Sequence, residues 1–511
     1  MTLTAPFLSA LLLYLSSPGP GYYLCAWFAL VPLFWMCQQT EPVKSSLLGF
    51  LSGFFYYTLM LRWVTISLEN YGHLPWWISW PAMLLLAAYM GLYLAIFCWI
   101  ISCWLKRYTL IWVAPVIWIS LDFLRGFMFS GFPWQDLGYS QYSNPLLIQV
   151  ADLVGYYGVT FLIVLVNTVI FSLLAGFAPF FNIDSLRSNH TYPFRQSALA
   201  LMLISSALVY SFHQNNHYLS VGKQSGITTA IIQGSIDQEK KWRSGTACKT
   251  IDKYIDLSRQ AAEKSGLDLM IWPETAIPFL YPENFLMKKV IRETVNKGAY
   301  SLLTGIPSYT NNGGKINYYN SALLIRSGLQ LSFYHKQHLV PFGEYIPFKE
   351  KLKLPGPLVQ SIGNFSAGES SAPLPAGQAK LGIMICFESI FPELARKEVA
   401  SGADLLINIT NDAWFGYSGA PVQHMAMAVF RAVENRRSLA RAANTGISCF
   451  ISPAGHIKQK TPLFKPLFIR TELPLLQKRT VYNLYGYLFP LICLVLSGII
   501  LFFLATNRVH R

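Results

Sequence analysis

The chain has 511 residues, of which 53% are hydrophobic and only 13% are charged. In soluble domains about a quarter of the residues are charged, so this composition excludes a purely water-soluble protein. The high apolar content also excludes a disordered chain. The formal net charge is +15, but no arginine stripe or RNA-binding motif accompanies it, which argues against nucleic acid as a partner. In a membrane protein such a charge sets topology and favours anionic lipids.

The cysteines and histidines predict neither a disulfide framework nor a metal site. Five of the eight cysteines lie within apolar runs, and Cys248, Cys386 and Cys449 are far apart without CxxC spacing. His335 and His338 are close in sequence, but no cluster of further ligands accompanies them. We therefore expect no metal ion.

Residues 1–213 predict a bundle of about seven membrane-spanning helices. Most of their apolar stretches reach the roughly 20 residues that a span needs. They cover residues 5–16, 20–37, 45–66, 76–105, 109–127, 157–181 and 194–213. No basic residue precedes the short first stretch, so we do not expect a cleaved signal peptide. Another apolar run at 485–504 brings the expected number of spans to about eight.

The composition changes at about residue 222, after which charged residues occur at regular intervals. After a linker at 214–224, β-rich runs alternate with polar helical patterns over 225–474, which predicts an α/β domain. The expected strands are 228–233, 267–272, 301–305, 320–326, 381–386, 405–409 and 447–451. The expected helices are 246–265, 283–297, 389–401 and 422–442. Residues 475–511 then form a linker and the last span.

The basic residues of the short loops predict the orientation in the membrane. One set of loops and chain ends contains most of them: Lys44, Lys106, Arg107, Arg187, Arg195, Arg508 and Arg511. The loops on the opposite side contain few basic residues besides Arg125, and Arg62 lies near a helix end. Because positive charge marks the cytoplasmic side, we expect cytoplasmic termini and an α/β domain on the outer side, which is the periplasm of a Gram-negative cell.

The segment Ile271-Trp272-Pro273-Glu274-Thr275 ends an apolar strand in a carboxylate. Glutamate at a strand end is most often an ordinary loop residue. Here Trp-Pro restricts the backbone and shields the carboxylate, an environment that suits a general base.

The segment from Tyr334 to Pro347 carries Lys336 directly before an apolar run. A lone lysine is usually a solvated surface residue. A lysine drawn inward at a strand end supplies a fixed ammonium that stabilises an oxyanion.

The segment Gly382-Ile383-Met384-Ile385-Cys386-Phe387-Glu388-Ser389 places a cysteine after a buried strand. Such a cysteine is usually core packing. The alternative is a nucleophile at a strand-to-helix elbow, with the following backbone N–H groups aimed at an oxyanion.

The ordered set of glutamate, lysine and cysteine resembles the nitrilase superfamily. Apolar spans lie on both sides of the α/β domain, and with them the whole chain resembles the apolipoprotein N-acyltransferase family, which is the membrane-bound family of that superfamily. The stretches that carry this resemblance are Phe132–Gln135, Gly138–Gln141, Leu339–Pro347 and Asn408–Gly416. The resemblance implies an αββα sandwich for the α/β domain.

The resemblance also implies the residues of the site. Glu274, Lys336 and Cys386 match the family's catalytic triad, and Glu344 and Glu388 match supporting carboxylates. Trp242 stands where the family has a functional tryptophan, in a looser match. The position after the cysteine is often tyrosine, but here it is Phe387, whose backbone N–H would serve the oxyanion while any hydroxyl role is absent or supplied elsewhere.

The implied reaction moves an acyl chain from a phospholipid through a Cys386 thioester to the α-amine of a diacylglyceryl-cysteine apolipoprotein. It needs no cofactor, and nothing demands an oligomer, so a monomer is expected. Residues 347–365, with Lys349, Lys351 and Lys353 among apolar residues, suit an interfacial lid as well as a solvated loop. A membrane-tethered amidase or nitrilase is the main alternative, and a transporter with an accessory domain is the other.

Overall fold

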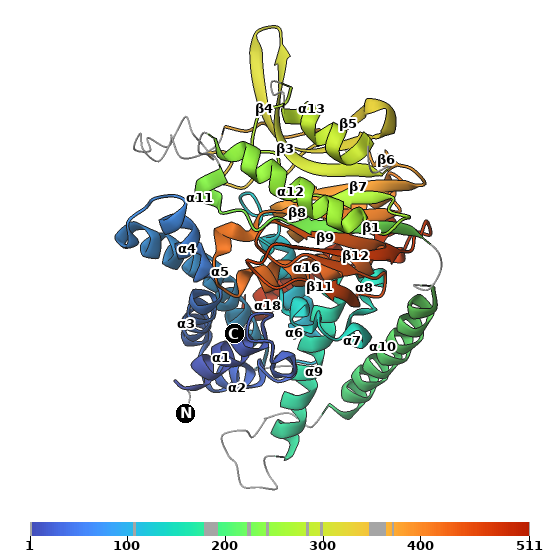
Figure 1. Cartoon of the computed structure of the whole chain (residues 1–511). Helices are drawn as coiled ribbons and strands as arrows, with labels where there is room; N and C mark the ends of the chain where they lie inside the picture. The colour runs from blue at the N-terminus through green and yellow to red at the C-terminus, as the bar shows by residue number, and fades with distance from the viewer. Residues whose placement is uncertain are drawn as a thin grey trace. The chain divides into compact units, whose positions relative to one another are not determined.

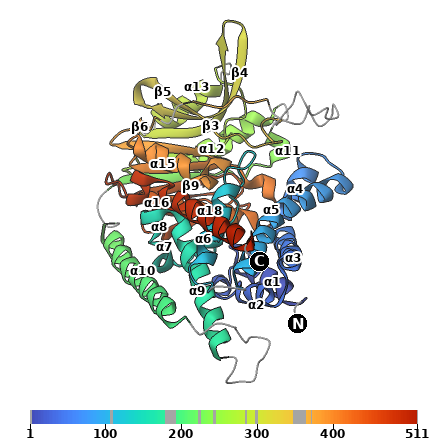
Figure 2. The same cartoon turned by 180° about the vertical axis from the view of Figure 1, so that it is seen from behind.

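The computed structural model describes residues 3–509 apart from 106–108, 178–192, 222–225, 242–244, 283–285, 297–299, 347–363 and 370–371. The chain forms two compact units. The helical unit comprises residues 1–214, 417–426 and 485–511, and the sandwich unit comprises residues 215–416 and 427–484. Figures 1 and 2 show the elements of both units from opposite sides.

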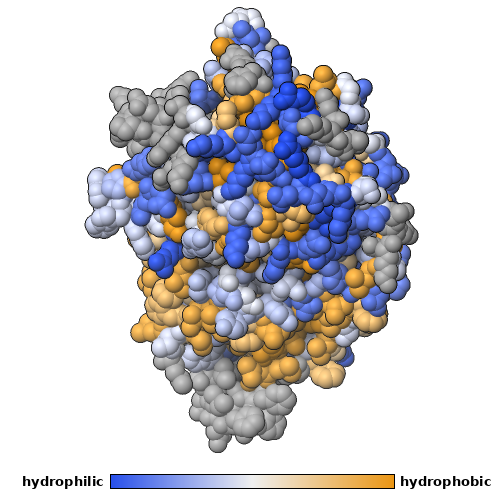
Figure 3. Space-filling view, viewed as in Figure 1, coloured by the Kyte–Doolittle hydropathy of each residue, from blue (hydrophilic) through white to orange (hydrophobic). Residues whose placement is uncertain are grey.

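The helical unit contains long apolar helices together with several shorter ones. The long ones are α3 (Pro42–Met60), α5 (Trp76–Leu105), α9 (Tyr156–Phe177), α10 (Phe194–Val221) and α18 (Leu488–Val509). The shorter ones are α1 (Ala5–Ser16), α2 (Val31–Gln39), α4 (Trp63–Asn70), α6 (Val113–Arg125), α7 (Pro145–Ile148) and α8 (Ala151–Val154). Figure 3 shows hydrophobic side chains over much of this unit's visible surface.

Four helices of the described residues are long and apolar enough to cross a membrane: α5, α9, α10 and α18. A fifth span results if α3 and α4, which meet at 51°, count as one broken span. About eight spans were expected from the sequence. The difference arises because α1, α2 and α6 have only 12, 9 and 13 residues, which is short of the roughly 20 that a straight span needs.

Close helix contacts and one buried charge cluster organise the helical unit. A Cβ at Gly53 would lie 2.8 Å from the Gly91 Cα, so small residues let α3 and α5 approach closely. At the end of α6, buried Arg125 pairs with Asp122 at 3.1 Å and also with Asp136. These pairs fasten the loop that carries the Phe132–Gln135 motif.

The sandwich unit contains two six-stranded sheets. The order of the first sheet is β12-β1-β2-β3-β4-β5, and that of the second is β11-β10-β9-β8-β7-β6. The first comprises β1 (Ile227–Gln233), β2 (Leu269–Ile271), β3 (Ser301–Asn312), β4 (Lys315–Arg326), β5 (Gln330–His335) and β12 (Leu467–Leu473). The second comprises β6 (Leu374–Ala376), β7 (Ala379–Ile385), β8 (Leu405–Thr410), β9 (Ser438–Ala443), β10 (Cys449–Ile451) and β11 (Ile457–Lys460).

The alternating pattern of the strands fills two apolar layers. In β1, Ile227 and Ile231 join the core between the two sheets, which also takes Ile383 and Ile385 of β7. The intervening Ala230 and Ile232 face α12 (Thr246–Ala262) and α13 (Leu286–Ile291). Helix α15 (Pro392–Ala400) packs against β7 of the second sheet, and α16 (Ala420–Asn435) precedes β9 of the same sheet (Figure 2). The layers are therefore helix, sheet, sheet, helix.

The expected helix over 422–442 is wrong in its last third. Helix α16 ends at Asn435, Arg436 adopts a φ of 49°, and β9 begins at Ser438. Its alanines and arginines favour helix, but β9 is fully buried between β8 and β10, and this pairing outweighs local propensity. Four strands were not expected from the sequence: β6, β9, β11 and β12. The strand end that was expected at Lys336 is the end of β5.

Candidate active site

Glu274 follows β2 and is held by two hydrogen bonds. Its Oε1 accepts from Asn320 Nδ2 at 2.8 Å, and its Oε2 accepts from the backbone N–H of Asn411 at 2.9 Å. The preceding Trp272 is fully buried, and its Nε1 donates to Ser258 Oγ at 2.9 Å. The carboxylate is thus fixed from both sides at the end of a rigid strand.

The Glu274 backbone lies flat against Gly305 of β3. A Cβ built on Gly305 would lie 2.3 Å from the backbone nitrogen of Thr275 and 2.6 Å from the Glu274 Cα. Such distances do not occur in real structures, so a side chain at position 305 displaces the loop.

Lys336 follows β5, and its side chain is 1% exposed. Its Nζ lies 2.9 Å from Oε1 and 2.8 Å from Oε2 of Glu344. Burial acts to lower the pKa of Lys336, but the negative charges of Glu344, Cys386 and Glu274 outweigh it and raise the pKa above its usual value. The ammonium therefore stays charged.

Cys386 follows β7 at a sharp change of chain direction. Its φ of 53° lies in the left-handed region, and the short helix η7 (Cys386–Ile390) starts there. Burial first, and the charge of Glu274 second, raise the pKa of the Cys386 thiol, which Lys336 and Thr410 partly oppose. The resting thiol is protonated, so it needs a base to become a nucleophile.

Asn320 joins the two carboxylates of the site. Its Nδ2 donates to Oε1 of both Glu274 and Glu344, each at 2.8 Å. The backbone carbonyl of Asn320 also accepts a hydrogen bond from the backbone N–H of Lys336 at 2.8 Å. Asn320 was not predicted as a site residue. Its only mark in the sequence is a polar side chain next to the apolar part of β4.

Glu388 ties the lysine loop to the cysteine elbow. Its Oε1 accepts from the backbone N–H groups of Gln337 at 2.6 Å and His338 at 3.1 Å, while its Oε2 accepts from Ile385 at 2.6 Å. Burial raises the pKa of Glu388 to about 7, although these hydrogen bonds and Lys336 oppose the shift. One carboxyl group thus sets the spacing of two loops.

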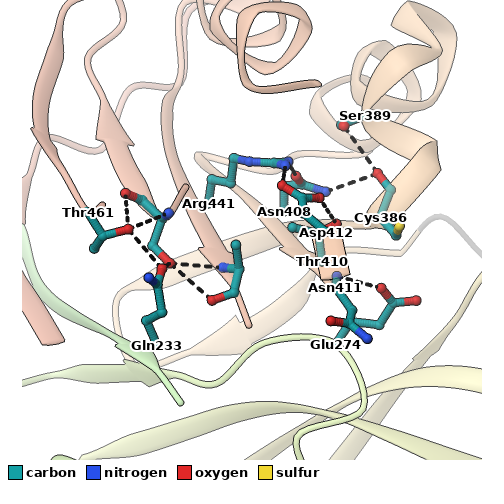
Figure 4. Close-up of polar contacts among 12 residues, drawn as sticks. Gln233, Glu274, Cys386, Ser389, Asn408, Thr410, Asn411, Asp412, Arg441 and Thr461 are labelled. Carbon is teal, nitrogen blue, oxygen red and sulfur yellow. Dashed lines mark hydrogen bonds and ion pairs between the residues drawn. The ribbon is translucent and has the colours of Figure 1, made fainter. Parts of the chain in front are cut away.

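The floor beside Cys386 is a buried polar network (Figure 4). Arg441 of β9 pairs with Asp412 Oδ2 at 2.7 Å and also donates to Asn408 Oδ1. Thr410 Oγ1 donates to Asp412 Oδ1 at 3.0 Å, and Asn408 Nδ2 donates to the Cys386 carbonyl at 3.4 Å. The stretch Asn408–Gly416 carries part of the family resemblance in the sequence, whereas no role was predicted for Arg441.

The structure does not place every residue that the sequence singled out. Trp242 and residues 347–363, with the three lysines of the expected lid, lie outside the described residues. The Phe387 ring packs on Phe391 at 5.2 Å between centroids, and the oxyanion role of its backbone N–H stays a prediction. His335 contacts Ser321 and Tyr319, and among the described residues no group of three potential metal ligands occurs.

The end of the expected lid is anchored at the site. The N–H of Phe365 donates to the Glu344 carbonyl at 3.1 Å, and that of Gly368 donates to the Lys336 carbonyl at 2.8 Å. A Cβ at Gly368 would lie 2.2 Å from the His335 oxygen. The backbone after residue 363 therefore lies directly against the lysine loop.

A buried carboxylate, a buried ammonium and a buried thiol, which follow β2, β5 and β7, are the groups that acyl transfer through a cysteine requires. The family model "Carbon-nitrogen hydrolase" matches residues 228–475, which contain these three groups, and the chain has the fold of that class. A second model, "Apolipoprotein N-acyltransferase N-terminal domain", matches residues 9–169.

Relatives match nearly the whole chain. "Apolipoprotein N-acyltransferase" of Geobacter metallireducens is 40% identical over 96% of this chain and 93% of its own length. The protein of that name from Photobacterium profundum is 30% identical over 94% of this chain and 91% of its own length. The chain belongs to the apolipoprotein N-acyltransferase family.

Among solved structures, Nit3 of Saccharomyces cerevisiae, a nitrilase-superfamily member, is 19% identical, with a TM-score of 0.39. The match covers 53% of this chain and 96% of that one. A carbon-nitrogen hydrolase from Helicobacter pylori G27 covers 51% of this chain and 94% of its own, with 19% identity and a TM-score of 0.38.

Proposed function

We propose that this chain transfers an acyl chain from a membrane phospholipid, through a thioester on Cys386, to the N-terminal α-amine of a diacylglyceryl-cysteine apolipoprotein. This is the last step of lipoprotein maturation. The observation that carries the proposal is the burial of Glu274, Lys336 and Cys386 on loops linked by the hydrogen bonds of Asn320, Glu344 and Glu388, within a chain whose relatives bear the acyltransferase name.

In the first half-reaction Glu274 takes the proton of the Cys386 thiol, and the sulfur attacks the ester carbonyl of the phospholipid. The tetrahedral oxyanion is stabilised by the Lys336 ammonium and by the Phe387 backbone N–H. The C–O bond then breaks, Glu274 returns the proton to the leaving alkoxide, and lysophospholipid departs. Glu274 is ionised again and Cys386 carries the acyl group.

In the second half-reaction the neutral α-amine of the acceptor attacks the thioester carbonyl. Glu274 takes a proton from the amine nitrogen, and the C–S bond breaks to give an amide. The Cys386 sulfur leaves and regains that proton from Glu274. An α-amine has an ordinary pKa near 8 and a lysine side chain one near 10.4, so the N-terminus is far more often neutral near pH 7.

The supporting residues act through these three. Glu344 holds the Lys336 ammonium by two contacts, and Glu388 spaces the lysine and cysteine loops. We propose Trp242 as a further supporting residue because it stands where the family has a functional tryptophan. Each proton and leaving group is handled by side chains, so the proposed steps use no metal ion or cofactor.

The proposed setting is the inner membrane of a bacterium, with both termini in the cytoplasm. Residues 225–474 form the periplasmic catalytic domain, joined by a linker at 214–224 to a seven-span bundle at 1–213 and followed by the last span within 475–511. The basic residues of the short loops support this orientation of the termini and of residues 225–474. The protein works as a monomer with a phospholipid donor and an apolipoprotein acceptor, and nucleic acid is not a partner.

Mass spectrometry of the full chain incubated with phospholipid alone tests the proposal. The wild type should accumulate an acyl group on Cys386 that neutral hydroxylamine removes. Cys386→Ala and Glu274→Gln should show no adduct, because one lacks the sulfur and the other lacks the base. Lys336→Ala should form it about 10²–10³ times more slowly, as other oxyanion donors do when removed.

Cys248→Ala and Cys449→Ala serve as matched controls that retain the adduct. An acyl group on either cysteine, or full activity of Cys386→Ala, would contradict the assignment of the nucleophile. A membrane-tethered amidase would instead release free fatty acid when the diacylated peptide is added, whereas the transferase forms an amide on that peptide.

A further inference from the structure

The short helix α17 (Val481–Tyr485), which leads into the last apolar helix, has its polar and apolar sides reversed. Asn483 within it is fully buried. Its exposed residues are Val481, Leu484 and Tyr485, with 46%, 52% and 64% of their surface accessible. Their i, i+3, i+4 spacing places these three on one helix face. Helix α17 therefore buries an amide and exposes an apolar face, which is the opposite of a helix surface that meets water.

Hydrogen bonds of the buried amide keep the apolar face outward. Asn483 Nδ2 donates to the Arg396 carbonyl at 3.1 Å and to Asn435 Oδ1 at 2.8 Å. The Asn483 carbonyl accepts from Arg396 Nη1 at 3.0 Å. These contacts fasten α17 to α15 and to the end of α16. The apolar face does not turn inward without breaking them.

Two basic residues, Lys478 and Arg479, precede α17 on a backbone that is fixed as well. Buried Arg437 donates to the carbonyls of Gln477 at 2.8 Å and Lys478 at 2.9 Å. Arg479 Nε donates to the neutral amide oxygen of Asn483 at 2.6 Å. In the described part of the chain, neither Lys478 nor Arg479 forms an ion pair with a carboxylate. Both are exposed, so two positive charges stand beside the apolar face.

The chain after α17 indicates what covers this face. Helix α18 begins at Leu488 and is one of the helices long and apolar enough to cross a membrane. A segment directly before a span lies where hydrocarbon gives way to headgroups. An apolar helix face with adjoining lysine and arginine binds anionic lipid at that depth. In the orientation proposed above, this end of α18 lies outside the cytoplasm, where topology does not call for basic residues.

We propose that Lys478, Arg479 and the exposed face of α17 bind an anionic phospholipid of the bilayer that surrounds α18. The two cations contact its phosphate group, and Val481, Leu484 and Tyr485 contact its glycerol and upper acyl region. The surface includes no member of the proposed triad, and no acyl group moves on it. It goes beyond acyl transfer, because it selects the lipid that lies beside the last span.

Native mass spectrometry of the full-length protein in detergent tests the proposal, with equal amounts of phosphatidylglycerol and phosphatidylcholine added. The wild type should retain phosphatidylglycerol in preference. In the double variant Lys478→Gln, Arg479→Gln this preference should fall by about 5- to 30-fold, because each basic residue near an anionic surface contributes about five-fold to the affinity. Leu484→Ser should weaken retention of both lipids, since it alters the apolar face and no charge.

Two further double variants are the controls. Lys478→Arg, Arg479→Lys keeps both charges and should keep the preference. Lys249→Gln, Lys264→Gln removes two exposed lysines on and after α12 and should also keep it. An unchanged preference in Lys478→Gln, Arg479→Gln overturns the proposal. Equal loss of both lipids in that variant, together with a lower unfolding temperature, overturns it too, because the residues would then only support the structure.

An excess of inorganic phosphate separates a lipid site from a site for free phosphate. Phosphatidylglycerol should stay bound, because the apolar face holds its glycerol and acyl region. Displacement of the lipid by phosphate would overturn the proposal. Lipid retention requires no acyl transfer, so a protein that forms no thioester on Cys386 but keeps the preference would contradict the proposed function and leave this inference intact.

Discussion

The guanidinium of Arg441 lies 2.7 Å from Oδ2 of Asp412, and neither side chain is exposed to solvent. The pair joins β9 to the short helix η8 (Asp412–Phe415), which follows the loop residue that donates to Glu274. A Cβ at Gly446 would lie 2.2 Å from the same Asp412 oxygen, so there is no room for the carboxylate to move that way. The pair therefore holds the floor of the candidate site in one arrangement.

Arg441→Met should destabilise the sandwich unit by about 3–5 kcal/mol, because it leaves the Asp412 charge buried without its partner. The double variant Arg441→Met, Asp412→Leu should regain part of this loss, since no lone charge remains. Thermal unfolding of the purified protein in detergent measures both effects. Equal unfolding temperatures for Arg441→Met and the wild type, or simple additivity in the double variant, would contradict this account.

Asn320→Leu should slow acylation of Cys386 by about 10- to 100-fold. It removes the hydrogen bond to Glu274, and one bond to a charged group contributes about 1.5–3 kcal/mol, which corresponds to this range. Asn320→Asp should be at least as slow, because it places a third carboxylate beside Glu274 and Glu344. Rates of thioester formation measure this, and Asn317→Leu on the same strand is the control. An active Asn320→Asp would show that the amide does not separate the two carboxylates.

Glu388 should make the protein less stable as the pH rises. Its pKa is raised from 4.5 to about 7 in the folded state, so the folded chain holds this proton more tightly than the unfolded chain. Its stabilising contribution is full below pH 4.5 and is lost as the pH rises through about 7, amounting to about 3 kcal/mol. The unfolding temperature should therefore fall over this window in the wild type.

Glu388→Gln should flatten that fall, because glutamine does not titrate. Exposed Glu263→Gln, at the end of α12, should keep the wild-type slope. If Glu388→Gln retains the full pH dependence, other buried groups such as Glu398, whose pKa burial raises to about 8, account for it.

Reporter fusions test the orientation in the membrane. A reporter fused near Asn215 should be exported, whereas one fused after Arg511 should remain in the cytoplasm, because basic loops mark the inner side. Alkaline phosphatase and green fluorescent protein fusions in whole cells distinguish the two compartments. Both fusion points on the same side would contradict the eight-span arrangement.

The proposed triad was visible in the sequence because its members lie where apolar runs end or begin. Glu274 and Cys386 follow apolar strands and Lys336 precedes an apolar run, and hydrogen bonds through Asn320, Glu344 and Glu388 link the loops that carry them. Asn320 itself was not visible in this way, because its contact with Glu274 depends on the antiparallel register of β3 and β4, which no local pattern specifies.

The elements were predicted least well where tertiary pairing opposes local propensity. The helix-favouring residues after Asn435 form β9 because a buried strand is needed between β8 and β10. The edge strands β11 and β12 are short or partly exposed, so neither gave a strong alternating signal. In the helical unit, composition marked the apolar segments, but breaks such as that between α3 and α4 depend on packing.

The contact between Gly305 and the Glu274 loop has a consequence for how this chain tolerates mutation. Every amino acid except glycine carries a Cβ, so each missense change at position 305 pushes an atom into the backbone that holds the carboxylate. The position makes no chemical contribution of its own and would pass unnoticed in a search for reactive side chains. It should nonetheless be as intolerant of substitution as Cys386, because the Glu274 loop keeps its position only when residue 305 has no Cβ.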